Sequence, residues 1–425
     1  MATLGPDDES FELKQDQELR FEVENAPIEI EVTSGLAEIF GVELVKSKKY
    51  LFPIGAKGAV FTWQGCAITM KNARKNMTYV SKDTTPMNYY MNVHIILEKQ
   101  RDEAENDSKR GPITMIVGPQ DVGKSTLCHI LLNYAVRMPG LNRKPIFIDL
   151  DVGQGEISVP GTIGALVIER PATIEDGFSQ LAPIVYNFGH LTPTANMDLY
   201  QHCVERLWKS VDERMNKDAK TNASGMIINT CGWIKGDGFK CLLACAKRLR
   251  VDNILVLDQE RLYQELKRDL PKTTDVVLLH KSGGVVDRTR QYRSEARDKR
   301  IKEYFYGSRL KPFNPHSFDV KFGEVQIYKI GAPVLPDSCM PLGVTATDFL
   351  TKVVLVQPGP SLLHHLLAMS FATTEQEIID TNIIGFVCVT NVDMQRQTIS
   401  VLCLQARPLP CTKLILTDIQ YMDSN

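Results

Sequence analysis

The sequence contains no long apolar run. No stretch of its 425 residues approaches the ~18 apolar residues that a membrane-spanning helix requires. The acidic N-terminus, Met1–Glu9, also lacks the apolar segment of a signal peptide. The ten cysteines include no C-x-x-C pair, and Cys241 and Cys245 have no second pair that would complete a zinc site. We therefore expect a soluble intracellular protein with no membrane partner and with buried free thiols.

An excess of charge of one sign is absent as well. The chain has 49 Lys and Arg against 51 Asp and Glu, a formal net charge of −2. This balance excludes a protein covered with basic residues, so any surface for nucleic acid must be local. The 43% hydrophobic and 24% charged residues are typical of a globular protein, and the length predicts two or three domains.

The N-terminal part shows the pattern of short β-strands. Phe21–Glu24 and Ile28–Val32 alternate apolar and charged residues, which is the period of a half-exposed strand. We interpret residues 11–95 as a small β-sandwich or barrel. In the next segment, Glu98–Arg110, nine of thirteen residues are charged, so it is either the solvated end of a helix or a domain linker.

From Pro112 onward, short and nearly continuous apolar runs alternate with helix-like segments. Such runs are typical of strands buried on both faces, and the alternation predicts a parallel sheet covered by helices. After Pro312 the strands are short and alternating again, with one helical piece near Leu362–Met369. We predict an α/β fold, with a mostly parallel central sheet between a smaller all-β N-terminal domain and a mostly-β C-terminal domain. The expected domains are 1–103, 104–311 and 312–425; the expected central strands are 113–117, 146–150, 225–229, 253–257 and 275–279; the expected helices include 125–137, 198–216 and 238–250.

Gly118–Thr126 fits the pattern G-x-x-x-x-G-K-[ST] and lies between an expected strand and an expected helix, as a phosphate loop requires. The glycines let main-chain N–H groups turn toward phosphate oxygens, and the helix adds the positive end of its dipole. Lys124 is expected to reach the β- and γ-phosphates, and Ser125 to bind Mg²⁺. A structural glycine turn is the alternative. The central domain is thus predicted to be a P-loop NTPase domain, with ATP bound by Gly118, Asp121, Val122, Gly123, Lys124, Ser125 and Thr126.

Two carboxylates follow the next apolar run. Asp149 and Asp151 lie two residues apart at the end of Ile146–Leu150, so strand alternation directs both to one face. Asp151 is nearer to the crevice where ligands bind in such sheets. We assign it as the general base or metal partner, and Asp149 as a packing residue or as a residue that supports Asp151.

Nucleotide binding leaves the fate of the γ-phosphate open. A GTPase would need Asn-Lys-x-Asp, and Asn216–Ala219 lacks the final Asp; motifs of a transporter or helicase motor are also missing. Residues 281–311, which we call the basic lid, carry ten Lys or Arg against four acidic residues. Arg293, Arg297 and Arg300 share a helical face, where they could offset charge in a phosphoryl-transfer transition state. The alternative is a solvated amphipathic helix with Tyr292, Ala296 and Tyr304 on its buried side.

Trp233 follows Asn229–Gly232 at the expected active edge of the sheet. A tryptophan at this position can stack on a nucleobase, an interaction that tolerates different bases. Core packing is the ordinary alternative.

Eight segments together resemble one family, the eukaryotic polyribonucleotide 5′-hydroxyl kinases that are also subunits of messenger-RNA cleavage and polyadenylation factor II. The resemblance covers nearly the whole chain. Its marks are Glu18–Glu24, Gly55–Lys57 with Phe61–Trp63, Gly118–Thr126, Leu150–Gly155, Asn229–Trp233, Leu257–Tyr263 and Lys281–Val286.

The resemblance implies roles for further residues. Glu18 and Lys57 of the N-terminal domain are expected to contact ATP. Thr192–Asn196 is similar to the loop that clasps the RNA end, with Thr192 and Asn196 as contacts, and Gln154 is expected near the acceptor. Three residues match the lid arginines of the family: Arg288, Arg293 and Arg297.

The resemblance also implies nuclear RNA processing: association with the transfer-RNA splicing endonuclease, and messenger-RNA 3′-end formation through a scaffold partner of the cleavage factor. We therefore expect an ATP- and Mg²⁺-dependent kinase of the 5′-hydroxyl end of RNA. A non-catalytic scaffold in which trapped ATP joins the domains is the main alternative. A kinase of free nucleosides is a third possibility, which the basic lid disfavours.

Overall fold

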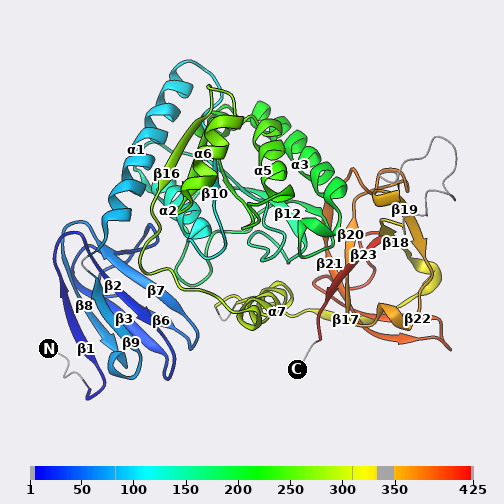
Figure 1. Cartoon of the computed structure of the whole chain (residues 1–425). Coiled ribbons are helices and arrows are strands. Elements are labelled where there is room, and N and C mark those ends of the chain that lie inside the picture. The colour runs from blue at the N-terminus through cyan, green and yellow to red at the C-terminus, as the bar shows by residue number, and fades with distance from the viewer. Residues whose placement is uncertain (1–4, 82, 309, 333–348, 423–425) are drawn as a thin grey trace.

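The computed structural model describes residues 5–422 apart from residues 82, 309 and 333–348. It shows a central α/β domain between two β domains, with the N-terminal sheets on one side and the C-terminal sheet on the other (Figure 1). This arrangement confirms the predicted fold class. Within the described residues, no helix has both the length and the apolar character needed to cross a membrane.

The N-terminal domain consists of two sheets that face each other, a four-stranded one in the order β1-β8-β3-β6 and a five-stranded one in the order β5-β4-β7-β2-β9. Ile28, Ile30 and Val32 are fully buried, whereas Glu29 and Glu31 between them stay partly exposed, as the alternating pattern predicts. The strands are β1 Glu9–Leu13, β2 Gln17–Glu22, β3 Ile28–Gly35, β4 Glu38–Ile39, β5 Val42–Glu43, β6 Lys49–Phe52, β7 Lys57–Thr62, β8 Cys66–Lys71 and β9 Met77–Ser81.

The β interpretation is wrong from residue 85, where helix α1 (Thr85–Asn106) begins. Pro86 suits the first turn of a helix, and buried residues recur along α1 at helical rather than alternating spacing. Of the two alternatives for the charged segment, the helix is correct through Asn106, but Glu98 and Arg101 are buried and paired with each other rather than solvated. Since α1 packs on α2 (Lys124–Arg137) and α4 (Ala219–Ser224), it covers the central domain.

The central sheet has the order β13-β12-β11-β14-β10-β15-β16. Five neighbouring strands of this sheet are parallel, as predicted: β11, β14, β10, β15 and β16. At one edge β12 and β13 pair antiparallel, and these two strands were not anticipated. The strands are β10 Ile113–Val117, β11 Ile146–Asp149, β12 Thr162–Val167, β13 Ile184–Asn187, β14 Met226–Asn229, β15 Asn253–Leu257 and β16 Asp275–Leu279; the remaining helices are α3 Met197–Lys217, α5 Asp237–Arg248, α6 Glu260–Asp269 and α7 Arg290–Tyr306.

The C-terminal domain is a seven-stranded sheet in the order β17-β22-β21-β20-β23-β18-β19. The helical piece predicted near Leu362–Met369 is wrong. Only Pro360–Leu362 forms a 3₁₀ turn, and the rest enters β20, a central strand with buried residues on both faces, whose continuous apolar run hides the period of two. The strands are β17 His316–Lys321, β18 Gln326–Ile330, β19 Val353–Val356, β20 His365–Ser370, β21 Ile383–Asp393, β22 Thr398–Cys403 and β23 Lys413–Gln420.

Candidate functional site

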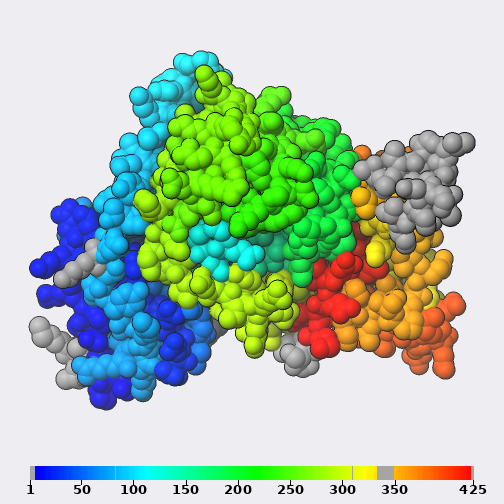
Figure 2. Space-filling view, viewed as in Figure 1, coloured from blue at the N-terminus to red at the C-terminus, as the bar shows by residue number. Residues whose placement is uncertain are grey.

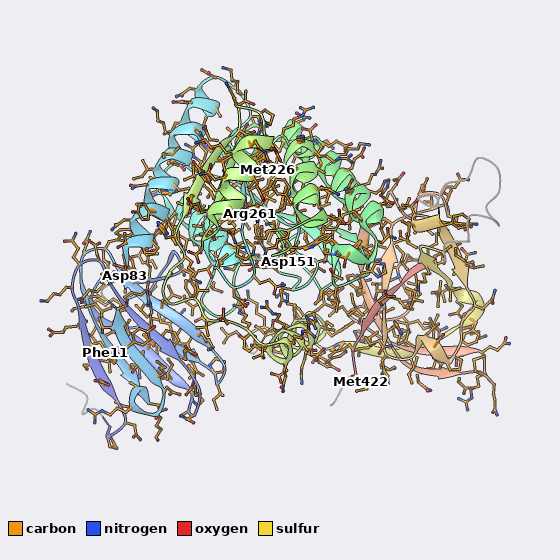
Figure 3. All side chains as sticks on the ribbon, viewed as in Figure 1. Phe11, Asp83, Asp151, Met226, Arg261 and Met422 are labelled. Carbon is orange, nitrogen blue, oxygen red and sulfur yellow. The ribbon has the colours of Figure 1, made fainter. Side chains whose placement is uncertain are left out.

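Three neighbouring parallel strands end at the same edge of the central sheet. β14 pairs with β10 on one side and with β11 on the other, so the segments that follow these strands converge. They are the phosphate loop after β10, Asp151 after β11, and Trp233 after β14. Figure 3 places Asp151 at this edge, on the side of the central domain that faces α7.

The phosphate loop has the backbone geometry that its glycines permit. Gly118 has a φ of 154°, and a Cβ there would lie 2.8 Å from the Leu257 carbonyl oxygen. Gly123, with a φ of 86°, is the N-cap of α2, and no side chain caps the first turn. The first N–H groups of α2 therefore remain available to an anion, which fits the predicted phosphate site.

Lys124 is buried at the start of α2, where its ammonium donates a hydrogen bond to the Pro119 carbonyl oxygen at 2.7 Å. Burial lowers the pKa of Lys124, and the nearby carboxylate of Asp151 opposes this shift. A buried cation next to uncapped amides is a donor set suited to a polyphosphate.

The two aspartates of the neighbouring segment occupy different environments. Asp149 is buried and accepts three hydrogen bonds, from Asn229 Nδ2 and from the N–H groups of Asp151 and Glu156, each at 3.0 Å. Burial, with the charges of Glu156 and Asp151, raises the pKa of Asp149 to about 8. Asp149 thus holds the loop that follows β11, as a packing residue would.

Asp151 is half-buried and accepts a hydrogen bond from the Gly153 N–H at 2.9 Å. Burial raises the pKa of its carboxyl, while this hydrogen bond and the charges of Lys124 and Arg293 act in the opposite direction. A carboxylate of raised basicity beside the phosphate loop can accept a proton from a bound alcohol.

An ionic pair between α2 and the loop after β11 was not anticipated. His129 Nε2 lies 2.5 Å from Glu156 Oε1. Burial lowers the pKa of His129, but the Glu156 carboxylate outweighs it and the net shift is upward. The two residues come from separate segments without a shared motif, although His129 lies one helical turn beyond Ser125.

The basic lid contains helix α7, and its first turns reach the phosphate loop. Asp121 Oδ2 accepts hydrogen bonds from the Arg288 N–H, at 3.0 Å, and from the Arg293 guanidinium. Arg300 donates to the carbonyl oxygens of Gly155, Glu156 and Ser158, in the loop after Asp151. The lid thus contacts both the phosphate loop and the segment that carries the acidic residue.

The alternative interpretation of this segment, a solvated amphipathic helix with a buried side, fits only the C-terminal end of α7. Tyr292 and Ala296 stay partly exposed, whereas Ile301 and Phe305 in the last turns are fully buried. Arg297 is also partly exposed on α7.

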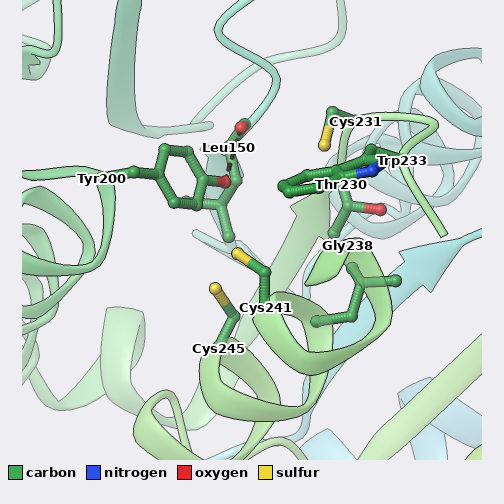
Figure 4. A pocket seen from close by; sticks show the side chains of 9 residues that line it. Leu150, Tyr200, Thr230, Cys231, Trp233, Gly238, Cys241 and Cys245 are labelled. Carbon is green, nitrogen blue, oxygen red and sulfur yellow. Dashed lines mark hydrogen bonds between the residues drawn. The ribbon is translucent and has the colours of Figure 1, made fainter. Parts of the chain in front are cut away.

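Trp233 forms one wall of a small pocket at the end of β14 (Figure 4). Its indole lies on Gly238, where a Cβ would come within 2.7 Å of the ring, and it is half-buried. The Tyr200 hydroxyl across the pocket donates to the Leu150 carbonyl oxygen at 2.9 Å. One part of the Trp233 ring is therefore packed while another remains accessible. The pocket is lined by Leu150, Tyr200, Thr230, Cys231, Trp233, Gly238, Cys241, Leu242 and Cys245.

The N-terminal domain docks on α2, the helix that the phosphate loop opens. Glu38 receives a hydrogen bond from Tyr134 and pairs with Arg137. Glu18 is buried and bonded to Arg20, whose guanidinium also lies 3.4 Å from the Ser282 hydroxyl. Glu18 is thus near the start of the basic lid.

Lys57, the other residue expected to contact ATP from this domain, pairs with Glu22. The structure therefore places the two residues differently: Glu18 is buried, and Lys57 is exposed at the start of β7.

The loop expected to clasp RNA, Thr192–Asn196, precedes α3. The Thr192 hydroxyl is exposed and lies 2.9 Å from that of Thr194. Asn196 is buried as the N-cap of α3; its Oδ1 accepts from the Leu199 N–H at 3.1 Å, and its Nδ2 donates to the Leu350 carbonyl oxygen. The Asn196 amide thus caps α3 and also bonds to the segment before β19. Gln154 is half-buried in the loop that follows Asp151.

A phosphate loop, an adjacent carboxylate and an arginine-bearing lid define a P-loop phosphate-binding protein with two added β domains. Family models match nearly all of it: the N-terminal beta-sandwich domain of polyadenylation factor over residues 12–104, the mRNA cleavage and polyadenylation factor CLP1 P-loop over 118–307, and the pre-mRNA cleavage complex II protein Clp1 over 313–423. The Protein CLP1 homolog of Anopheles gambiae is 54% identical over 418 residues, covering 98% of this chain and 97% of the relative. That of Drosophila melanogaster is 52% identical over 419 residues, covering 98% of both. The chain belongs to the Clp1 family of mRNA cleavage and polyadenylation proteins, which confirms the predicted family.

Solved structures show the same fold. The wild-type Clp1p–Pcf11p complex matches with a TM-score of 0.83 and 24% identity, over 99% of this chain and all of the other. A second structure, with the same TM-score, identity and coverage, concerns an extended interface between Pcf11p and Clp1p and the basis for ATP loss in a point mutant.

Proposed function

We propose that this chain is an ATP-dependent polynucleotide kinase that transfers the γ-phosphoryl group of ATP to the 5′-hydroxyl end of RNA. The observation that carries the proposal is the position of Asp151, which follows β11 at the same sheet edge as the phosphate loop and directly precedes the loop that Arg300 of the lid contacts. A phosphate-binding cation and a proton acceptor side by side provide the two groups that transfer to an alcohol requires.

In this mechanism the uncapped amides of α2 and Lys124 hold the triphosphate, and Asp151 accepts the proton of the 5′-hydroxyl. The 5′-oxygen forms a bond to the γ-phosphorus while the bond from that phosphorus to the ADP oxygen breaks. Arg288, Arg293 and Arg297 of the lid offset the negative charge of the transferred group. Ser125 and Asp151 present hard oxygen ligands that fit Mg²⁺, which would neutralise phosphate charge when bound.

The other residues supply binding. Trp233 stacks on the terminal base, Thr192 and Asn196 contact the RNA end, and Gln154 faces the acceptor. Glu18 and Lys57 complete the ATP site from the N-terminal domain.

We place this activity in the nucleus, in messenger-RNA 3′-end processing and transfer-RNA splicing. Support for the first comes from the family models and from a structural relative in complex with Pcf11p. A scaffold subunit of the cleavage factor and the transfer-RNA splicing endonuclease are the proposed protein partners.

The test is transfer of label from γ-labelled ATP to a short RNA with a 5′-hydroxyl end; the same RNA with a 5′-phosphate is the control. Lys124→Ala should abolish transfer. Trp233→Ala should raise the Kd for RNA by about tenfold, because base stacking contributes roughly 1–3 kcal/mol, and should leave ATP binding intact. If the RNA acquires no label in the presence of the intact chain, the proposal is refuted.

The alternative is a scaffold that retains ATP without transferring phosphate, since the buried Lys124 and the uncapped start of α2 would bind ATP in either case. Bound ATP that stays intact in the presence of the 5′-hydroxyl RNA would support the scaffold.

A further inference from the structure

Helix α7 divides into two parts with different surroundings. Its first part carries Arg293, which reaches Asp121, and Arg300, which reaches the loop after Asp151. Its last turns contain Ile301 and Phe305, which are fully buried in a hydrophobic cluster shared with the C-terminal domain. In Figure 2 the yellow-green surface that includes α7 lies directly against the red surface of the last strand. The helix therefore begins at the phosphate site and ends in another domain.

The C-terminal end of α7 is held by directional contacts as well as by apolar packing. The Phe386 N–H of β21 donates to the Tyr304 hydroxyl at 2.9 Å, and the two rings meet edge to face with centroids 5.9 Å apart. Phe305 stacks on Tyr421, with centroids 6.4 Å apart. Gly385 leaves room for the Tyr304 hydroxyl, since a Cβ at Gly385 would lie 2.6 Å from it.

The same domain also contacts the loop that precedes α3. The Leu350 carbonyl oxygen accepts from Asn196 Nδ2, and the Asp418 N–H donates to the Gly189 carbonyl oxygen at 2.9 Å. His190 pairs with the Asp418 carboxylate at 2.6 Å. The C-terminal domain is thus bonded both to α7 and to the loop before α3.

We propose that the C-terminal β domain positions the lid. In this proposal Tyr304 is the positioning residue, because its contacts with Phe386 fix the base of α7 and thereby the location of the arginines at the other end. The structure connects Phe386 to Tyr304 at one end of a continuous helix and Arg293 to the phosphate loop at the other. A helix is stiff over this length, so a displacement of its base moves the arginines that face the phosphates. The catalytic consequence rests on the proposed kinase function, whereas the mechanical connection does not.

The test uses a steric clash and its relief. Gly385→Ala places a methyl group 2.6 Å from the Tyr304 hydroxyl, and its next contacts are Met369 Cε at 3.4 Å and Tyr304 Cζ at 3.9 Å. The double variant with Tyr304→Phe removes the hydroxyl and leaves only ordinary contacts. Tyr304→Phe alone measures the loss of the hydrogen bond. Gly323→Ala is the matched control, since a Cβ at Gly323 meets nothing within 4 Å and lies in the same domain.

Two measurements on the full chain are compared. Hydrogen exchange should be faster in residues 290–300 for Gly385→Ala and unchanged in α6. The kcat for the 5′-hydroxyl RNA should fall by about tenfold or more, as ~1 Å misplacements do, at a Kd for ATP within about twofold of the parent. Tyr304→Phe alone should change both readouts less than Gly385→Ala does, because it loses the hydrogen bond without a clash. The double variant should recover exchange protection and kcat to the level of Tyr304→Phe alone, and the thermal midpoint identifies any variant that is merely unfolded.

Unchanged exchange in residues 290–300 of folded Gly385→Ala would overturn the proposal, as would a double variant no better than Gly385→Ala alone. A parent chain without kinase activity would refute the proposed function instead. In that case the exchange measurement alone still decides whether the C-terminal domain holds the lid.

Discussion

Asp121 offers a direct test of the contact between the phosphate loop and the lid. Its carboxylate accepts from both the Arg288 N–H and the Arg293 guanidinium, and the Asp121 and Arg293 side chains are only 11% and 20% exposed. The substitution Asp121→Asn keeps the shape and removes the charge. Asparagine also tolerates the left-handed backbone at this position, where φ is 55°, so the loop itself should stay intact.

The loss can be sized from the hydrogen bond that changes. A charge-assisted bond contributes about 1.5–3 kcal/mol, and roughly half of this should disappear with the charge, since such bonds are about twice as strong as neutral ones. A loss of about 1 kcal/mol lowers the ratio of closed to open lid about fivefold. We expect kcat for RNA phosphorylation to fall by a similar factor in Asp121→Asn, with a Kd for ATP that changes by less than about threefold.

The assay is steady-state phosphorylation of a 5′-hydroxyl RNA together with hydrogen exchange of α7. Asp298→Asn is the control, because Asp298 is an exposed acid on the same helix. A fully active Asp121→Asn with unchanged exchange in α7 would show that this contact does not hold the lid.

Two further predictions concern stability. Asn196→Ala should lower the free energy of unfolding by about 1–2 kcal/mol in urea titrations, because it removes the N-cap of α3 and the bond to Leu350; an unchanged midpoint would contradict this role. Burial, reinforced by the charges of Arg101 and Arg137 and opposed by Glu98, lowers the pKa of His94 to about 4. Since the unfolded pKa is near 6.5, the unfolded chain binds the proton first, and stability is lost as pH falls from about 6.5 to 4, by about 3 kcal/mol in total. The chain with His94→Gln should show a correspondingly shallower pH dependence.

The phosphate site was predictable because its signals are local. Strand, loop and helix follow one another in one short segment around Gly118–Thr126, so the motif and its context can be read together. The place of Asp151 at the same edge was predictable for the same reason, since it follows the next strand, β11, by two residues. Asn196 carries a readable signal of another kind: an asparagine directly before a helix that starts at Met197 predicts an N-cap.

The features of the site that the sequence did not predict are contacts between residues far apart in the chain. The pair of His129 and Glu156 joins a helix to a later loop, and Tyr304 meets Phe386 across 82 positions. No period or motif indicates which distant residues will meet. The error at β20 has a different cause, because a strand buried on both faces has no alternation to distinguish it from a buried helix.

The local charge of the lid explains why it needs anchoring from elsewhere. Residues 281–311 hold ten basic against four acidic residues. On α7, Arg293 contacts the Asp121 carboxylate, and Arg300 contacts the Glu303 carboxylate and backbone carbonyl oxygens of the 155–158 loop. Such contacts exchange readily for phosphate oxygens, which accept the same hydrogen bonds with more charge. In the proposed mechanism the first turns of α7 release these partners when phosphate binds, so those turns alone do not hold the helix. The apolar base at Ile301 and Phe305, which no phosphate can displace, is therefore the part of α7 that keeps its position while the arginines change partners.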